Sequence, residues 1–314
     1  MAKDSAIEWC DHTFNPWHGC VKISEGCKNC YAEARQFGGD WWGKDKPRRF
    51  FGEKHWQQPI RWNAEAEELG VRYKVFCGSY CDVFEKREDL KEPRERLGKL
   101  IQDTPHLDWL LLTKRPENVY LLSGELSWVI ATLRAVHEDG QEEWDFLPFF
   151  PENVWLGVSV ENQKQADIRI PELLKIPAKV RFLSCEPLLE KVLLDNGEAS
   201  WLTCNGENRS GIEGEHVCCE SEFVIGECFH GIDWVIVGGE SGPNARPMNP
   251  DWARSIHDQC KGANVSYFLK QMGTHWAKYE KLDPFTTVYE KGDRKGANPI
   301  YWPPDLNVRQ FLEV

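Results

Sequence analysis

The sequence predicts an α/β fold, a (β/α) barrel that is either partial or complete, and three observations carry this prediction. Short apolar runs end abruptly in polar residues or glycine, as buried parallel strands do. Helix-like stretches separate most of these runs, which is typical of a parallel sheet covered by helices. The 314 residues suffice for one large core, so we expect a single barrel domain over residues 1–314.

The predicted elements follow one another through most of the chain. Strands are expected at 7–14, 74–80, 109–115, 154–160, 180–186, 233–239 and 266–271. Helices are expected at 87–103, 117–138, 163–176 and 249–262. Two segments interrupt this alternation: a basic and aromatic segment at 36–63, and a Cys-rich insertion between late strands at 196–232.

Composition narrows the class of protein. The chain has 38 Lys and Arg against 50 Asp and Glu, a net charge of −12, which argues against a protein that coats nucleic acid. No run approaches the about 20 apolar residues of a membrane span, and the first residues lack the apolar core of a signal peptide. We therefore expect a cytoplasmic protein with no membrane partner.

Polar residues gather where the predicted strands end. Side chains alternate between the two faces of a strand, so Leu156 and Val158 share the face toward the helices, while Ser159 and Glu161 share the barrel interior. Catalytic groups of such barrels lie at the carboxyl ends of the strands. The polar residues predicted there are Ser79, Asp82, Thr113, Lys114, Arg115, Ser159, Glu161, Glu186, Glu240 and Lys270. We expect them to line one site.

The loop after the first strand contains the spacing Cys20-x6-Cys27-x2-Cys30. Three thiolates this close in sequence can hold one metal centre. One alternative is zinc, with a fourth ligand from Cys10, His12 or His18. The other is a cubane iron–sulfur cluster, which can take three cysteines and leave one iron open. Spacing alone leaves both alternatives open.

A second group, Cys204, Cys218, Cys219 and Cys228, lies with His216 and His230 in the Cys-rich insertion. A small glycine-rich loop rarely adopts one ordered structure unless a disulfide or a bound metal cross-links it. Zinc, an auxiliary iron–sulfur cluster, or a lid with unpaired thiols would each account for this group. By contrast Cys77, Cys185 and Cys260 stand in apolar settings and are expected to be ordinary buried residues.

Five motifs in order carry a resemblance to a known family. They are NPWHGC at 15–20, LTKRP at 112–116, WLGVSVEN at 155–162, LSCEPLL at 183–189 and VGGESG at 237–242. Together with the three-cysteine loop, they resemble an uncharacterised three-cysteine-motif family of phages and bacteria, distantly related to the radical S-adenosylmethionine (SAM) superfamily. The resemblance runs from about residue 7 to residue 273.

The resemblance implies that Cys20, Cys27 and Cys30 ligate a [4Fe-4S] cluster whose open iron holds SAM. Reductive cleavage of SAM, with an electron from a donor such as flavodoxin or ferredoxin, would then produce a 5′-deoxyadenosyl radical. The superfamily pattern is Cys-x3-Cys-x2-Cys with an aromatic residue before the third cysteine. Here the first gap is six, and the aromatic residue, Tyr31, follows the third cysteine.

The same resemblance implies roles for residues at the strand ends. Ser79 and Asp82 would hold the SAM ammonium, although Asp82 could equally be the N-cap of the helix that follows. Residues Ser159, Glu161 and Asn162 suit the ribose, Tyr31 stands where an adenine contact is expected, and Lys114 or Arg115 suits a carboxylate or substrate anion. The candidate catalytic residues are Lys114, Glu186, Glu240 and Lys270, and Cys81 or Cys185 is a candidate hydrogen donor.

Residues 44–61 carry six cations and two carboxylates, a local charge of +4, with Trp and Phe residues interleaved. Cations with exposed aromatics can bind a phosphodiester strand, but the aromatics can also pack the segment onto the barrel, and we favour packing. The first hypothesis is a radical SAM enzyme that modifies or repairs a nucleotide or DNA base. The alternatives are a zinc-stabilised accessory protein without enzymatic activity, which binds nucleic acid or a host factor, and a barrel that binds SAM without cleaving it.

Overall fold

The computed structural model of the chain describes residues 3, 5–35, 39–136, 142–148, 150–195, 200–203 and 231–312. Within these residues the fold is α/β, and its main element is a seven-stranded sheet with the order β1-β2-β3-β6-β7-β8-β9. The pairs β1–β2, β2–β3, β7–β8 and β8–β9 are parallel. Sequential parallel strands with β1 and β9 at the two edges correspond to a partial (β/α) barrel, as predicted.

The seven strands of this sheet are β1 (His12–Phe14), β2 (Tyr73–Cys77), β3 (Leu107–Thr113), β6 (Val154–Ser159), β7 (Val180–Cys185), β8 (Trp234–Gly238) and β9 (Ser266–Gln271). The helices are α1 (Tyr31–Ala34), α2 (Glu53–Leu69), α3 (Lys91–Gln102), α4 (Val119–Ser123), α5 (Gln163–Leu174), α6 (Pro250–Ala263) and α7 (Thr274–Tyr279). Single 3-10 turns are η1 (Glu25–Cys27), η2 (Glu88–Leu90), η3 (Pro116–Asn118), η4 (Pro299–Tyr301) and η5 (Pro304–Leu306). Six of the predicted strands are confirmed, and the strand predicted at 7–14 forms only over His12–Phe14. The helices predicted at 87–103, 163–176 and 249–262 are confirmed as well.

The helix predicted at 117–138 is wrong over its second half. Helix α4 ends at Ser123, and Val129–Val136 forms strand β4, which pairs antiparallel with β5 (Glu142–Pro148) from Val129 opposite Pro148 onward. β-branched residues are frequent in the β4 sequence and favour a strand once a partner is available. A second small pair, β10 (Lys281–Asp283) with β11 (Thr286–Thr287), lies near the C-terminus.

The chain divides into two compact units. Unit 1 comprises Met1–Val21, Phe37–Leu156 and Lys175–Lys179, and unit 2 comprises Lys22–Gln36, Gly157–Leu174 and Val180–Val314. Strands β1–β3 and helices α2–α4 belong to unit 1, whereas β7–β9 and helices α1 and α5–α7 belong to unit 2. The residues of β6 are divided between the units after Leu156.

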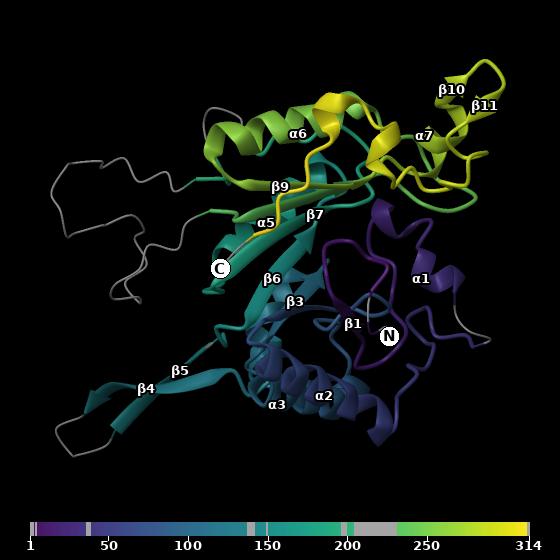
Figure 1. The fold of residues 1–314 in the computed structure, drawn as a ribbon. Coiled ribbons are helices and arrows are strands. Elements are labelled where there is room, and N and C mark those ends of the chain that lie inside the picture. The colour runs from purple at the N-terminus through teal and green to yellow at the C-terminus, as the bar shows by residue number, and fades with distance from the viewer. Residues whose placement is uncertain are drawn as a thin grey trace, which may run out of the picture. The chain divides into compact units, whose positions relative to one another are not determined.

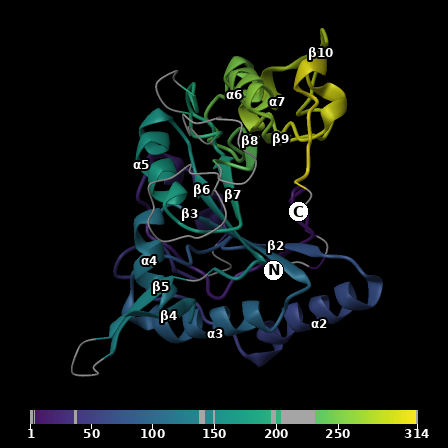
Figure 2. The same cartoon turned by 90° about the vertical axis from the view of Figure 1, so that its left-hand side faces the viewer.

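In unit 1, helices α2 and α3 lie on the same face of β1–β3 (Figures 1 and 2). The core between them is aromatic: Phe14 is fully buried and meets the rings of Trp56 and Trp109 edge-on at 5.3 and 5.7 Å. Buried ion pairs complement this core, and Arg48 binds Glu85 through two nitrogens. This packing fixes the loops that follow β1 and β2.

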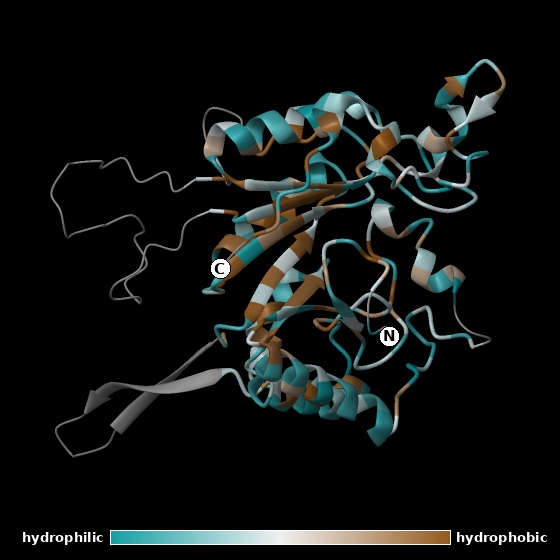
Figure 3. Cartoon of the chain, in the orientation of Figure 1, coloured by the Kyte–Doolittle hydropathy of each residue, from teal (hydrophilic) through white to brown (hydrophobic). Residues whose placement is uncertain are grey.

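In unit 2, helix α6 packs along β8 and β9 (Figure 1). Its buried residues Ala253, Ile256 and Cys260 recur at helical spacing, and Figure 3 shows hydrophobic strands beneath a largely hydrophilic helix exterior. Asn249 begins the helix by accepting a hydrogen bond from the backbone N–H of Asp251 at 3.0 Å. No helix among the described residues combines the length and the apolar composition that crossing a membrane requires.

Candidate functional site

The three motif cysteines differ from the other described cysteines in exposure. Cys20 follows β1 in unit 1, whereas Cys27 ends η1 and Cys30 immediately precedes α1 in unit 2. All three are partly exposed. The five other described cysteines are buried: Cys10, Cys77, Cys81, Cys185 and Cys260. The motif residues are therefore more accessible than the other described cysteines, although the thiol of Cys20 is itself largely removed from water.

In unit 1, Asn15 connects the loops after β1 and β2. Its Nδ2 donates to Ser79 Oγ at 2.9 Å, and its Oδ1 accepts from the backbone N–H of Tyr80 at 2.6 Å. The backbone N–H of Gly19 donates to the carbonyl of Tyr80 at 2.9 Å. Ser79, predicted to contact SAM, is thus buried and serves to fix the segment that leads to Cys20.

Asp82 is buried after β2, and donors of the chain itself occupy both of its oxygens. Oδ1 accepts from Thr113 Oγ1 at 2.8 Å and from the backbone N–H of Phe84 at 3.1 Å, and Oδ2 accepts from Arg115 Nη1 at 2.7 Å. The alternative of a helix N-cap is wrong, because α3 begins only at Lys91 and the bond to Phe84 closes a local turn. These donors give the carboxylate a structural role.

Arg115 extends this network to the first cysteine. Nη1 also donates to Cys20 Sγ at 3.7 Å, and Nη2 donates to the carbonyl of Val21 at 2.8 Å. The pKa of Cys20 is raised to about 12, first by burial and then by the nearby Asp82 carboxylate, while Arg115 opposes both effects. Without a metal the Cys20 thiol therefore keeps its proton at neutral pH, and metal binding would have to displace that proton.

Lys114 is the half-buried neighbour of Arg115 at the end of β3. Its backbone N–H donates to Asp82 Oδ2 at 3.2 Å. Within the described part of the chain, its ammonium has no hydrogen-bond or ion-pair partner. Of the predicted cationic candidates in unit 1, Lys114 is the one placed to bind an anion.

In unit 2, the cysteine loop is connected to the end of β6 by Glu161. This side chain is fully buried; Oε2 accepts from Arg169 Nη1 at 2.7 Å, and Oε1 accepts from the backbone N–H of Gly26 at 3.2 Å. A Cβ at position 26 would lie 2.9 Å from Glu161 Cδ, so this approach requires glycine. Arg169 Nη1 also donates to the carbonyl of Ser159 at 2.8 Å. Glu161 was predicted to bind ribose, but its described partners belong to the chain.

Glu240 connects the same loop to the end of β8. Oε2 accepts from Asn29 Nδ2 at 2.9 Å and from the backbone N–H of Arg246 at 2.8 Å, and Oε1 accepts from Arg246 Nη2 at 2.6 Å. Burial opposes ionisation of this carboxyl, but the bonds from Arg246 and Asn29 outweigh it and lower the pKa of Glu240. Glu240 is therefore an ionised anchor for Asn29 and lacks the free oxygens expected of a catalytic group.

Glu186 and Lys270, both predicted as catalytic residues, lie together at the ends of β7 and β9. Lys270 Nζ donates to the two carboxylate oxygens at 2.7 and 2.8 Å, and Gln271 Nε2 donates to Glu186 Oε1 at 3.4 Å. The side chains remain 20% exposed for Glu186 and 15% for Lys270. This ion pair can therefore be reached by a solute in unit 2.

Two further candidates flank helices of unit 2. Asn162 Oδ1 accepts from the backbone N–H of Gln165 at 3.0 Å, so this side chain caps α5, and its assignment to ribose stays a prediction. Tyr31 begins α1 and is 41% exposed.

The basic and aromatic segment is held to unit 1 mainly by its aromatic side chains. Trp42, Trp56 and Trp62 are buried, which confirms packing as their main role. Its exposed residues include Lys44, Lys54, Arg61 and Phe50. Residues Cys204, Cys218, Cys219, Cys228, His216 and His230 lie outside the described residues. Among the residues that are described, no group of three or more His, Cys, Asp or Glu forms a metal-binding arrangement.

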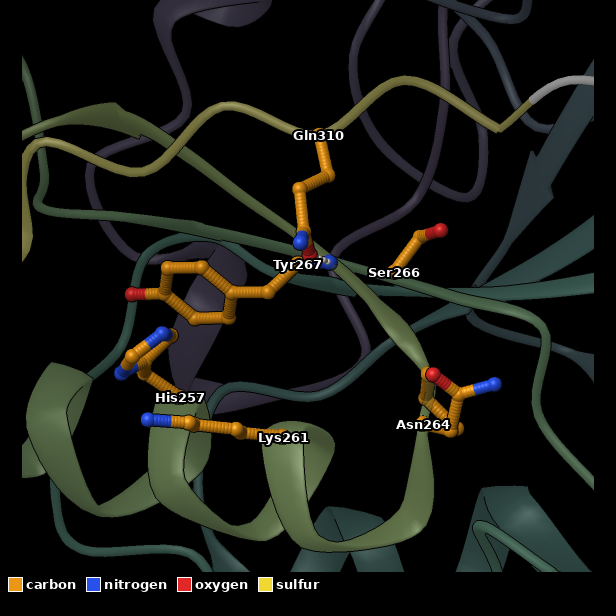
Figure 4. A pocket seen from close by; sticks show the side chains of 7 residues that line it. His257, Lys261, Asn264, Ser266, Tyr267 and Gln310 are labelled. Atoms are coloured by element: carbon orange, nitrogen blue, oxygen red, sulfur yellow. Dashed lines mark hydrogen bonds between the residues drawn. The ribbon is translucent and has the colours of Figure 1, made fainter.

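A pocket of unit 2 lies away from these strand ends. Figure 4 shows His257 and Lys261 of α6 facing Tyr267 near the start of β9, with Gln310 on the other side. The rings of His257 and Tyr267 meet at 5.1 Å, and Gln310 Oε1 accepts from the backbone N–H of Tyr267 at 2.9 Å. The polar groups at this end of β9 hold the C-terminal segment, whereas Lys270 lies near the other end of the strand.

Sequence reasoning missed the arginines that connect these carboxylates. Arg115 was assigned only to an external anion, and neither Arg169 nor Arg246 was considered. One clue was available for Arg169: it occupies the buried face of α5 with Ala166 and Ile170. A cation on an apolar helix face requires a buried acidic partner, which here is Glu161.

The fold and these networks define an α/β protein with a partial barrel and polar residues at the carboxyl ends of its strands. Over residues 4–297 the chain matches the model of a family described as protein of unknown function, DUF5131. That match covers well over half of the chain, and the protein belongs to this family. No curated protein and no solved structure matches the chain.

Proposed function

We propose that this protein is an iron–sulfur enzyme of the radical SAM type, in which Cys20, Cys27 and Cys30 hold a [4Fe-4S] cluster. The observation that carries the proposal is the partial exposure of these three residues, whereas the other described cysteines are buried. Cysteine thiolates are the ligands of such clusters, so the donor set fits. When bound, the cluster would supply the electron that cleaves SAM reductively.

Zinc is the competing use of the same thiols. Structural zinc takes four protein ligands, and Cys10, His12 and His18 are the candidates for the fourth. All three are buried in unit 1, where the His12 ring stacks on Trp62 at 4.4 Å and the His18 ring on Tyr80 at 4.9 Å. Because these side chains are committed to the packing of unit 1, the three-cysteine alternative is favoured.

The polar groups of the chain would bind and orient the reactants. The ammonium of Lys114 suits the carboxylate of SAM or an anionic group of the substrate. Glu186 and Lys270 form a partly exposed pair that can hold a substrate hydroxyl or exchange a proton with it. The electron would come from a carrier protein such as flavodoxin or ferredoxin.

The substrate we propose is a nucleotide or a base in DNA. The support is the exposed part of the basic and aromatic segment, where Lys44, Lys54 and Arg61 accompany Phe50, which is 47% exposed. Cations attract phosphate and an exposed ring stacks on bases. The net charge of −12 opposes sequence-independent coating of nucleic acid, so binding would be confined to this site.

Anaerobic reconstitution tests the proposal. Protein supplied with iron and sulfide should turn brown, absorb in the charge-transfer region of iron–sulfur clusters, and release 5′-deoxyadenosine from SAM under reduction. Cys20→Ala, Cys27→Ala and Cys30→Ala should each abolish cluster assembly. Cys260→Ala, which alters a buried cysteine of α6, should retain it and serves as the control.

Two other results would overturn the proposal. Stoichiometric zinc without iron or SAM cleavage would indicate a zinc-stabilised accessory protein. A loaded cluster that binds SAM but yields no 5′-deoxyadenosine would indicate a barrel that has kept the cofactor and lost the reaction.

A further inference from the structure

We propose that Glu161 and Glu240 are positioning residues that hold the segment Gly26–Cys30 in place, and thereby set the positions of Cys27 and Cys30. The inference rests on the proposed function only in taking these two cysteines as cluster ligands. The anchoring itself consists of hydrogen bonds within unit 2.

The segment has little apolar packing to hold it. Turn η1 has no buried residue, and the only buried residue of α1, which follows, is Ala32. At the start of η1, Ser24 makes no side-chain capping bond to the backbone. A segment of this kind depends on hydrogen bonds for its conformation.

The two anchors act on either side of Cys27. Glu161 binds the backbone N–H of Gly26, the residue before Cys27, and Glu240 binds the side chain of Asn29, the residue before Cys30. Each carboxylate is buried at the end of a strand, so each anchor is fixed to the sheet. Two bonds separated by three positions restrict both translation and rotation of the segment.

Each anchor is held in turn by an arginine. Arg169 binds Glu161 from α5, and Arg246 binds Glu240 through its backbone and its guanidinium. Arg246 Nη1 also lies 3.5 Å from Glu25 Oε2, at the first position of η1. Bonds to ionised acceptors are shorter and stronger than neutral ones, which suits a segment that must hold two ligands at fixed positions.

The bonds by which the two anchors hold this segment are made to Gly26 and Asn29, and this separates positioning from ligation. Changing Cys27 or Cys30 removes a thiol, whereas changing an anchor leaves both thiols present but less well placed. The effect of an anchor on metal binding is therefore indirect, through residues 26 and 29, in the way that outer-shell partners orient metal ligands.

Hydrogen–deuterium exchange and thiol labelling of the metal-free chain test the inference. In Glu240→Gln and Asn29→Ala, amides of residues 24–30 should exchange about tenfold faster or more, and Cys27 and Cys30 should react correspondingly faster with a maleimide. Asn29→Ala leaves the pair of Glu240 and Arg246 intact, so it removes the anchor without unpairing a buried charge. Glu280→Gln, an exposed carboxylate of unit 2, should change neither rate and is the matched control.

Iron content after reconstitution gives the second measurement. We expect Asn29→Ala to lose iron faster to a chelator than the unaltered chain, at an unchanged unfolding midpoint. Unchanged exchange and labelling in both variants would overturn the inference. A chain that takes up no iron would overturn the proposed function instead, while the exchange rates would still decide the anchoring.

Discussion

At the scale of single residues, Arg115 connects the buried carboxylate of Asp82 to the first motif cysteine in unit 1. Its guanidinium is buried and contacts a carboxylate, a thiol and a backbone carbonyl. Burial alone would lower the pKa of Arg115, but Asp82 and then Cys20 outweigh it and keep the pKa above its usual value. The three acceptors lie in different directions. The guanidinium of an arginine has several N–H donors that can reach all three, whereas the ammonium of a lysine has a single nitrogen and cannot.

We therefore expect Arg115→Met to destabilise the chain by about 3 kcal/mol or more, because it leaves Asp82 buried and unpaired. Arg115→Lys should recover only part of this loss. The matched control is Arg254→Met, which breaks an exposed pair with Asp305 and should cost less than about 1 kcal/mol. Urea denaturation of the metal-free variants measures both costs. Equal losses for the buried and the exposed arginine would contradict this account of the site.

At the scale of elements, the region after β3 shows where sequence patterns mislead. Residues 117–138 were predicted as one helix, yet the chain turns from α4 into β4 within this range. Strand β4 pairs with residues 142–148 of β5, and the local sequence pattern of β4 carries no information about this partner. Helix α2 was missed for a different reason, since Pro59 and the aromatic residues mask its helical spacing. Long-range contacts decide only the first of these two cases.

Helices α3 and α6 each contain a glycine, and the same substitution should have opposite effects in the two. A Cβ at Gly98 of α3 would lie 2.0 Å from the carbonyl oxygen of Leu126, whereas a Cβ at Gly262 of α6 would meet nothing within 4 Å. We expect Gly98→Ala to destabilise the chain by about 1–3 kcal/mol through overpacking. Gly262→Ala should stabilise it by about 0.5–1 kcal/mol, because alanine restricts the unfolded chain. Thermal unfolding of the two variants gives the signs, and a gain in stability for Gly98→Ala would refute the close approach.

At the scale of the whole molecule, the sequence was enough to predict the sheet and the placement of polar residues at its strand ends. Apolar runs with abrupt polar ends can be recognised from local composition alone. The bounds of β7 and β9 were therefore predicted almost to the residue. The partners of the polar residues were not predictable in the same way. Glu161 and Glu240 stand after strands like any catalytic carboxylate, and only the folded chain brings Arg169 and Arg246 to them. Such pairings decide which carboxylates remain accessible, and Glu186 is one that does.

The stability of the whole chain should be greatest between about pH 6.5 and pH 9. Below and above this range, buried groups titrate more readily in the unfolded chain than in the native one, and this favours unfolding. Burial lowers the pKa of His55 from 6.5 to about 4, so the unfolded chain binds the extra proton and stability falls as the pH drops through this range. Burial raises the pKa of Cys260 from 9.0 to about 12, so the unfolded chain releases a proton that the native chain keeps, and stability falls again above pH 9.

Urea midpoints of the reduced, metal-free chain from pH 4 to pH 10 would trace this plateau. His55→Gln keeps an N–H donor for the carbonyl of Asn15 but does not titrate, so its acid limb should be shallower. An equal slope for the unaltered chain and for His55→Gln would show that this buried histidine does not limit stability in acid.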